Sequence, residues 1–334
     1  MVAFNKICDD DDRTIEGGCD LGNYKVFPRL RSGHKWVSRL AKDKSGKKWS
    51  FKYPDKDKIL TYHKKLAAHR GTPLEKIEAE AERDFLAYQE MLKEIAERSQ
   101  GLSHEHVCMV KGWAYLPEER NLVFISEYAP GIELFYAASE LDPISSVLLY
   151  ARALEGLSFI HSNGLLHLNV KPSRIYINLE GDETTVKFTD YGFAIPIQGY
   201  EGEYGYTPSY AASEVIQGQR DRIGESSDLF SFGIGWYECL TRHLPLGDRD
   251  IAGGDKNYLK QIVEREESVS SPPSHYNTGV PPEMDQLVLD LLEKDSNKRK
   301  YRYAEDVLAF IYEKWPEESK KLKETSTTTM EWQK

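Results

Sequence analysis

The stretch His167-Leu168-Asn169-Val170-Lys171-Pro172-Ser173-Arg174 decides how this chain is interpreted. A second stretch, Asp190-Tyr191-Gly192, begins 16 residues after it (190 − 174 = 16). The first stretch has two cationic side chains and no carboxylate, and the second opens with a carboxylate. The amide of Asn169 cannot accept a proton, and the guanidinium of Arg174 cannot ligate a metal ion. Together they predict a positively charged site without a general base in the first stretch.

These stretches resemble the catalytic loop and the metal-binding triplet of protein kinases, H-R-D-L-K-P-x-N and D-F-G. The resemblance covers roughly residues 24–316, with the motifs in the order and at intervals typical of that family. It implies an α+β fold of two lobes. A small, β-rich N-lobe with one long helix would be followed by a larger α-helical C-lobe.

Changes of composition along the chain predict its organisation. The N-terminal stretch contains Asp9-Asp10-Asp11-Asp12 and few apolar residues, which predicts a disordered acidic arm. The expected divisions are an arm over 1–22, a kinase-like domain over 23–318 and a flexible tail over 319–334. Within the domain we expect the N-lobe at about 23–128 and the C-lobe at about 132–318.

Hydrophobic periodicity and turn residues predict the main elements. The long N-lobe helix should begin at Thr72-Pro73 and end near Arg98, and Asp142-Pro143 should begin a C-lobe helix that runs to His161. Strands are expected near 35–42, 47–53, 109–116, 121–127, 175–178 and 186–189. Further helices are expected over 226–241 and near 256–265, 283–293 and 303–314.

The composition limits the compartment and the partners. The net charge of −10 disfavours a nucleic acid or an anionic membrane as partner. Four cysteines without C-x-x-C spacing suggest neither a zinc site nor a disulfide framework. No apolar run approaches the ~20 residues of a membrane span, and the N-terminus does not resemble a signal peptide. We therefore expect a soluble, intracellular, cytoplasmic protein.

The resemblance assigns the catalytic positions residue by residue. Asn169 stands at the position of the base, and Lys171 matches the lysine that neutralises the transferring phosphate. Thr207 matches the threonine that packs against the loop. Asp190 matches the metal-binding aspartate, while Arg174 replaces its amide partner and is expected to form an ion pair with it.

The resemblance also assigns nucleotide-binding positions in the N-lobe. Lys52 follows Val37 by 15 residues (52 − 37 = 15) and matches the lysine that binds phosphates, although an exposed edge-strand lysine is the alternative. Glu82 is its expected partner on the long helix, with Glu78 and Glu90 as rivals.

The phosphate-binding loop and the adenine pocket are altered. The family's loop glycines fall on Leu30, Ser32 and Lys35, and only Gly33 remains, out of register. Side chains there obstruct a close approach of phosphate to the backbone. The remaining assigned positions are Ser50 above the adenine, Ser126 as gatekeeper, Glu127 to Ala129 in the hinge and Tyr176 beneath the base. Tyr176 would either fill the adenine slot or turn into the core of the lobe.

The architectural positions survive better than the chemical ones. Asp228 matches the buried aspartate that holds the catalytic loop, and Glu214 and Arg299 match an ion pair between helices. His167 and Tyr191 match an aromatic stack. Leu168 replaces the arginine that usually binds a phosphorylated activation segment.

These substitutions favour a pseudokinase that acts as a scaffold or allosteric regulator of a protein partner, with no cofactor. The alternative is a weakly active or unconventional serine/threonine kinase that uses ATP and Mg²⁺, since Lys52, Lys171 and Asp190 persist. A module that senses nucleotide without transferring phosphate lies between the two.

Overall fold

The computed structural model describes residues 13–16, 23–32, 35–68, 72–116, 120–178, 184–190, 194–202, 204–247, 255–264, 269 and 271–318. The chain divides into two compact units. The first comprises Met1–Ser103 and Cys108–Tyr128, and the second comprises His104–Val107 and Ala129–Lys334.

The first unit is built on a six-stranded antiparallel sheet in the order β1-β2-β3-β4-β6-β5. Its strands are β1 (Arg13–Glu16), β2 (Asn23–Ser32), β3 (Trp36–Lys42), β4 (Lys48–Pro54), β5 (Val110–Leu116) and β6 (Asn121–Glu127). Alternate side chains of these strands form a buried cluster that includes Tyr24, Trp49 and Phe51. The expected strands of this lobe are therefore present.

The acidic composition of residues 1–22 predicted a disordered arm. Within that stretch, however, Arg13–Glu16 form strand β1. Strand β1 pairs with β2, placing Ile15 opposite Tyr24. A four-residue strand can form in an acidic stretch because a neighbouring strand supplies its hydrogen-bond partners. The rest of that stretch lies outside the described residues, as does the expected tail over 319–334.

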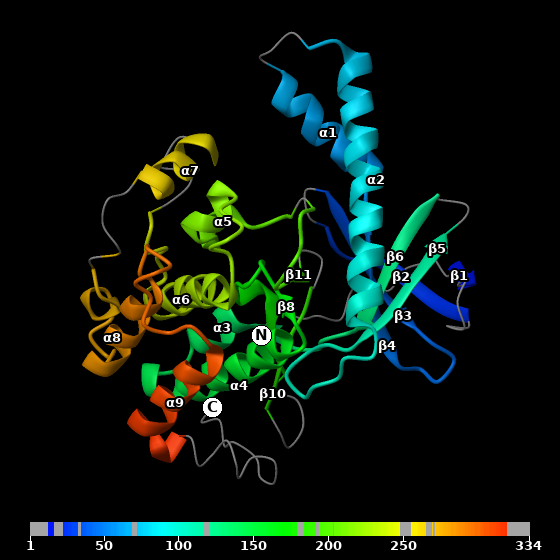
Figure 1. Ribbon diagram of the computed structural model, residues 1–334. Coiled ribbons are helices and arrows are strands. Elements are labelled where there is room, and N and C mark those ends of the chain that lie inside the picture. Colours follow the sequence, from blue (N-terminus) through cyan, green and yellow to red (C-terminus); the bar gives the residue numbers. More distant parts are fainter. Residues whose placement is uncertain are drawn as a thin grey trace. The chain divides into compact units, whose positions relative to one another are not determined.

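Two helices pack against each other in the same unit (Figure 1). Helix α2 (Leu74–Ser99) is the predicted long helix, and α1 (Lys56–Ala67) was not predicted. The Asp55 side chain caps α1 by accepting a hydrogen bond from the Lys58 amide at 3.1 Å. Ile59 of α1 is fully buried beside Ala81 and Phe85 of α2. The apolar face of α1 thus stabilises the helix against α2.

The second unit is mainly helical and carries two small sheets (Figure 1). Its α-helices are α3 (Leu134–Ala138), α4 (Pro143–Ser162), α5 (Ser213–Gln217), α6 (Glu225–Thr241), α7 (Asp255–Glu264), α8 (Pro282–Leu291) and α9 (Ala304–Lys314). The 3₁₀ turns are η1 (Pro172–Arg174), η2 (Pro208–Tyr210) and η3 (Pro273–His275). The strands are β7 (Ile132–Glu133), β8 (Leu165–Leu166), β9 (Ile175–Asn178), β10 (Thr185–Phe188) and β11 (Ile195–Pro196). Sheets β10-β9-β7 and β11-β8 account for the described strand pairs of this unit.

Helices α4 and α6 are the centre of this unit. Both are apolar almost all round, which is typical of helices buried inside a lobe. Asp142 caps α4 as predicted, accepting from the amides of Ile144 and Ser145. Gly235 of α6 has no room for a side chain, because a Cβ there would lie 2.9 Å from Cδ of Pro172. This contact lets the loop around Pro172 rest directly on α6.

Candidate functional site

The loop that holds Asn169 is fixed through its backbone by Asp228 on α6. The Asp228 carboxylate is fully buried and accepts from the amides of His167, at 2.7 Å, and Leu168, at 2.8 Å. His161 of α4 binds the same carboxylate through Nε2 at 2.9 Å. Leu168 has a φ of +52°, a conformation that costs a non-glycine residue about 1–3 kcal/mol. The charge-assisted bonds to Asp228 offset that strain.

Two histidines beside the loop titrate in opposite directions. Burial disfavours protonation of His161, but its bonds to Asp228 and Glu225 outweigh burial and raise its pKa to about 9. His167 is buried too, and burial lowers its pKa. His161 is therefore a buried cation at neutral pH, and His167 is neutral. His167 packs beside Phe188 with ring centroids 5.5 Å apart, and Tyr191, its expected stacking partner, lies outside the described residues.

Asn169, Thr207 and Lys171 form a hydrogen-bonded chain at the predicted catalytic positions. The Thr207 hydroxyl donates to Oδ1 of Asn169 at 2.7 Å, and Nζ of Lys171 donates to that hydroxyl at 3.0 Å. Asn169 is buried, and its Nδ2 has no hydrogen-bond partner among the described residues. An amide in this position holds Thr207 but cannot accept a proton from a substrate. The structure brings these three residues together while leaving the position without a base.

Arg174 and Asp190 form the ion pair that the sequence predicted. Nε of Arg174 lies 2.9 Å from Oδ2 of Asp190, and the two side chains are 28% and 11% exposed. The contact is electrostatic rather than a well-aligned hydrogen bond. The Arg174 carbonyl accepts from both the amide and the hydroxyl of Thr189, at 2.8 and 3.1 Å, which ties η1 to the strand end before Asp190.

The residues around Asp190 do not fit a magnesium ion. Mg²⁺ requires several oxygen ligands in octahedral geometry, whereas Arg174 offers only donors and places positive charge at the carboxylate. Among the described residues, no group of three or more His, Cys, Asp or Glu side chains is arranged to hold a metal ion. The geometry supports charge neutralisation by the protein's own guanidinium.

Comparison with known proteins identifies the family of the chain. The family model "Protein kinase domain" matches residues 62–309. The chain belongs to the protein kinase superfamily. The serine/threonine-protein kinase PknB of Mycolicibacterium smegmatis is 27% identical over 280 residues, which cover 79% of this chain and 43% of that protein. PknB of Mycobacterium tuberculosis is 26% identical over 252 residues, covering 72% and 38%.

A third relative, the maternal embryonic leucine zipper kinase of Xenopus laevis, is 29% identical over 157 residues, covering 45% of this chain and 23% of that protein. The chain thus spans less than half the length of these curated relatives. The kinase match begins at Tyr62, after the strand that carries Lys52. The assignment of Lys52 therefore depends on its spacing from Val37 rather than on the matched range.

Several positions that the kinase resemblance assigns to nucleotide binding lie on the sheet of the first unit. Lys52 is on β4 and only 8% exposed, with Nζ 4.9 Å from the centroid of the Trp36 ring. Its burial contradicts the alternative of an exposed edge lysine. Ser50 of β4 and Ser126 of β6 are direct partners across neighbouring strands, and Val37 of β3 is buried. Their roles toward a nucleotide remain predictions.

The structure gives Glu82 a different partner from the one expected. Its carboxylate lies 2.5 Å from Nζ of Lys56, and its side chain is 45% exposed. Lys56 is the first residue of α1, the helix that was not predicted, so an unforeseen cation reaches this glutamate. Of the two rivals, Glu90 lies 3.8 Å from Lys93, and Glu78 is exposed.

Lys35 stands where the kinase family has a glycine, and its side chain contacts both helices of the first unit. Its Nζ donates to the Tyr88 hydroxyl at 2.5 Å and lies 4.2 Å from the centroid of the Tyr62 ring. Burial lowers its pKa, against the opposing effect of Asp84. Gly33 and the side chains of Leu30 and Ser32 lie outside the described residues.

The remaining assigned positions fall on both units. Glu127 ends β6, and its amide donates to the Met109 carbonyl at 2.8 Å. Ala129 belongs to the second unit and is buried. Tyr176 is on β9, between β10 and β7, and is 9% exposed. This burial is compatible with both readings of Tyr176, so the choice between them stays open.

Glu214 and Arg299 form a buried, bidentate ion pair. The two contacts measure 2.7 and 3.0 Å, and both side chains are 1% exposed. Ser227 donates a further hydrogen bond to Glu214 at 2.7 Å, and Arg299 also donates to the Ser226 carbonyl at 3.0 Å. This network joins α5, the start of α6 and the loop before α9.

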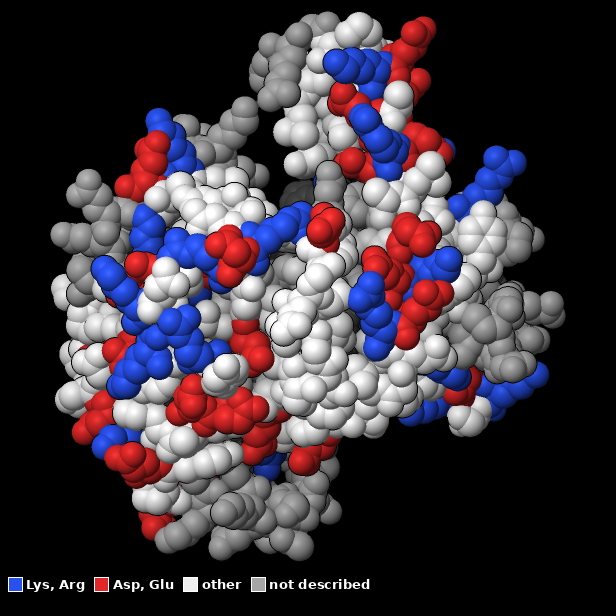
Figure 2. All heavy atoms as spheres, in the orientation of Figure 1, with Lys and Arg blue, Asp and Glu red and all other residues white. Residues whose placement is uncertain are grey.

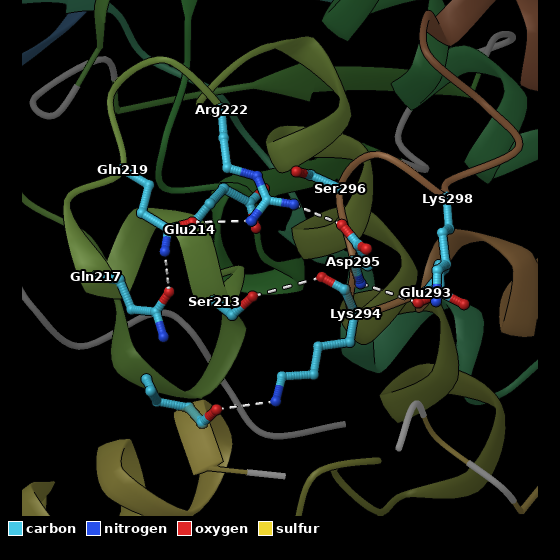
Figure 3. Close-up of a pocket in the computed structure, with 11 residues that line it drawn as sticks. Ser213, Glu214, Gln217, Gln219, Arg222, Glu293, Lys294, Asp295, Ser296 and Lys298 are labelled. Carbon is cyan, nitrogen blue, oxygen red and sulfur yellow. Dashed lines mark hydrogen bonds and ion pairs between the residues drawn. The ribbon is translucent and has the colours of Figure 1, made fainter. Parts of the chain in front are cut away.

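A polar pocket of about 300 Å³ opens beside this ion pair (Figure 3). Arg222 binds Asp295 at 2.5 Å, and Lys294 donates to the Val263 carbonyl at 2.8 Å. The side-chain amide of Gln219 donates to that of Gln217, and the Ser213 hydroxyl points toward the Lys294 carbonyl (Figure 3). The formal charges of the lining cancel, because its three acidic residues are matched by three basic ones: Glu214, Glu293, Asp295, Arg222, Lys294 and Lys298.

Two groups that contact the segment ending with η2 were not predicted from the sequence. Glu238 of α6 accepts from the Tyr210 hydroxyl at 2.6 Å, and burial raises its pKa despite the opposing effects of Tyr210 and Lys171. Arg220, in the turn between α5 and α6, donates to backbone carbonyls of the segment before η2. Helical periodicity gave no signal for Glu238, because ten positions at about 3.6 residues per turn do not return it to the face of Asp228 on α6.

Proposed function

We propose that this chain is a pseudokinase, a kinase-like protein that regulates or scaffolds a protein partner without efficient phosphoryl transfer. The observation that carries the proposal is the ion pair between Arg174 and Asp190. Phosphoryl transfer needs a held metal ion to neutralise the charge that develops on the phosphate. Here a fixed guanidinium competes with that metal for the carboxylate.

The lost base adds to the defect. Loss of a general base costs about 10²–10⁴ in rate, and Asn169 offers Thr207 an acceptor but offers a substrate none. The two defects act on different requirements of the reaction, so their costs combine. They support a protein selected for its fold rather than for turnover.

A protein partner and a cytoplasmic location belong to the same proposal. None of the described helices has both the length and the apolar character needed to cross a bilayer. On the face drawn in Figure 2, acidic and basic side chains lie interspersed instead of forming one basic field. With a net charge of −10, this supports a protein partner over a nucleic acid.

Thermal unfolding with ATP, with and without Mg²⁺, tests the proposal. We expect no Mg²⁺-dependent shift at millimolar ATP, because Arg174 opposes the metal. The double variant Asn169→Asp/Arg174→Asn restores the family's residues, so a Mg²⁺-dependent shift is expected there first. A shift of several degrees that requires Mg²⁺ in the unaltered chain would contradict the proposal, since ligand at ~100-fold over its Kd adds about 2.7 kcal/mol.

A weakly active serine/threonine kinase is the second candidate. Two observations favour it: the intact chain from Lys171 to Thr207, and relatives named as serine/threonine kinases. Incorporation of labelled phosphate into a basic protein substrate tests it. Transfer that Lys52→Met abolishes would establish this candidate, and background counts in both proteins would exclude it.

A further inference from the structure

One arginine outside the segment between β11 and η2 forms two hydrogen bonds with it. Arg220 donates from Nη1 to the Tyr200 carbonyl at 2.9 Å and from Nη2 to the Gly202 carbonyl at 2.7 Å. Its guanidinium carbon also lies 5.3 Å from the centroid of the Tyr204 ring, within the range of a cation–π contact. A single side chain thus contacts three residues of a five-residue stretch.

The turn that Arg220 grips is compact. The Tyr200 side chain folds back over Gly202, and a Cβ at Gly202 would lie 2.6 Å from the Tyr200 hydroxyl. The Tyr204 hydroxyl donates to the Val215 carbonyl of α5 at 2.9 Å, which fixes the far end of the stretch. The two carbonyls therefore face the arginine from a defined turn.

The stretch borders a pocket beside the strand pair β11-β8. A pocket of about 280 Å³ is lined by Tyr200 and Tyr204 together with Leu166 of β8 and Ile195 of β11. Among the described contacts, the two hydrogen bonds of Arg220 and the hydrogen bond from Tyr204 to the Val215 carbonyl connect the stretch to the chain beyond it.

The catalytic loop does not supply the usual restraint. Leu168 stands where the kinase family has an arginine for a phosphate on this segment, and it is buried at 5% exposure. A leucine side chain has no donor for a phosphate oxygen. Arg220, by contrast, presents a planar fork that can bind two acceptors at once.

We propose that Arg220 is a positioning residue that fixes this segment in one conformation without phosphorylation. The guanidinium binds backbone carbonyls, so the restraint exists whenever the chain is folded. The inference is independent of whether the protein transfers phosphate. It assigns the protein a segment whose conformation is built in rather than switched by a kinase.

Chymotrypsin digestion of the phosphatase-treated full chain tests this, because the enzyme cleaves after tyrosine. Arg220→Gln removes the fork, and Arg222→Gln is the matched control, since Arg222 lies in the same turn but binds Asp295. Loss of two hydrogen bonds predicts about tenfold faster cleavage after Tyr200 and Tyr204 in Arg220→Gln. The control should be cleaved at the unaltered rate. Arg220→Lys should also be cleaved faster, because it keeps the charge but not the fork.

Cleavage after Tyr303, which is 55% exposed and distant in sequence, serves as the internal reference. The proposal fails if cleavage after Tyr303 rises in step with cleavage in the segment, because the effect is then global. It also fails if Arg220→Gln and Arg222→Gln are cleaved at equal rates. Finally, it fails if phosphatase treatment alone accelerates cleavage of the unaltered segment, since a phosphate would then be the restraint.

Discussion

Replacing Arg174 with glutamine should destabilise the protein through Asp190. The two side chains lie 2.9 Å apart and are 28% and 11% exposed, so the pair is neither a surface pair nor fully buried. Exposed pairs contribute up to ~1 kcal/mol, and breaking a buried pair costs ~3–5 kcal/mol. Partial exposure places Arg174→Gln between these limits, at about 2 kcal/mol. Glutamine keeps most of the side-chain length, so the lost charge dominates the effect.

Urea unfolding at equilibrium measures this cost as a change in midpoint at constant slope. Arg222→Gln is the control, because its ion pair with Asp295 is 32% and 38% exposed and should cost less than ~1 kcal/mol. Millimolar Mg²⁺ should recover part of the stability lost in Arg174→Asn, where an amide oxygen joins the carboxylate as a ligand. It should not change the unaltered protein.

The reasoning would be refuted if Arg174→Gln cost no more than Arg222→Gln. Such a result would mean that Asp190 gains little from the guanidinium in the folded state. A Mg²⁺-dependent rise in the stability of the unaltered chain would refute the second part, because the metal would then displace Arg174.

Three further predictions concern the same lobe. His161 has a folded pKa of about 9, above its ordinary value of 6.5. Its contribution of about 3 kcal/mol should therefore be complete below pH 6.5 and lost as pH rises to 9. Urea unfolding across this range should show a fall in stability that His161→Gln flattens. Glu214→Gln should cost about 3–5 kcal/mol by leaving the Arg299 cation buried without its counterion, and a cost under ~1 kcal/mol in urea unfolding would contradict this. Asn169→Asp alone should leave incorporation of labelled phosphate at background, because Arg174 still opposes the metal; a gain of orders of magnitude would show that the rest of the site is competent.

The sequence predicted the catalytic loop of this chain well because its positions follow from linear spacing. The ion pair between Arg174 and Asp190 is an example. The motif places the two residues close together, and their opposite charges favour the contact. The N-lobe partner was harder. The choice of Glu82 as the partner of Lys52 depended on which face of α2 points inward, and the sequence does not specify that face. Helix α1, which was not predicted, places Lys56 beside Glu82.

Contacts between side chains and backbone were beyond the reach of sequence patterns. Arg220 binds two carbonyls, and every residue has a carbonyl, so no partner type marks the contact in the sequence. Tyr176 shows the same limit in another form. Its burial agrees with a tyrosine in the core and with one in a nucleotide slot, because both environments are apolar.

The way Asp228 holds the catalytic loop has a consequence for how such a protein can change over generations. Its carboxylate binds the amides of His167 and Leu168, and backbone amides are present whatever side chains the loop carries. Gly235 of α6 lets Pro172 of the same loop pack directly against the helix. A substitution at the position of Asn169 can therefore alter the chemistry without moving the peptide chain that carries it. A loop held through its backbone in this way can lose a reaction, or regain one, while its main chain keeps its conformation.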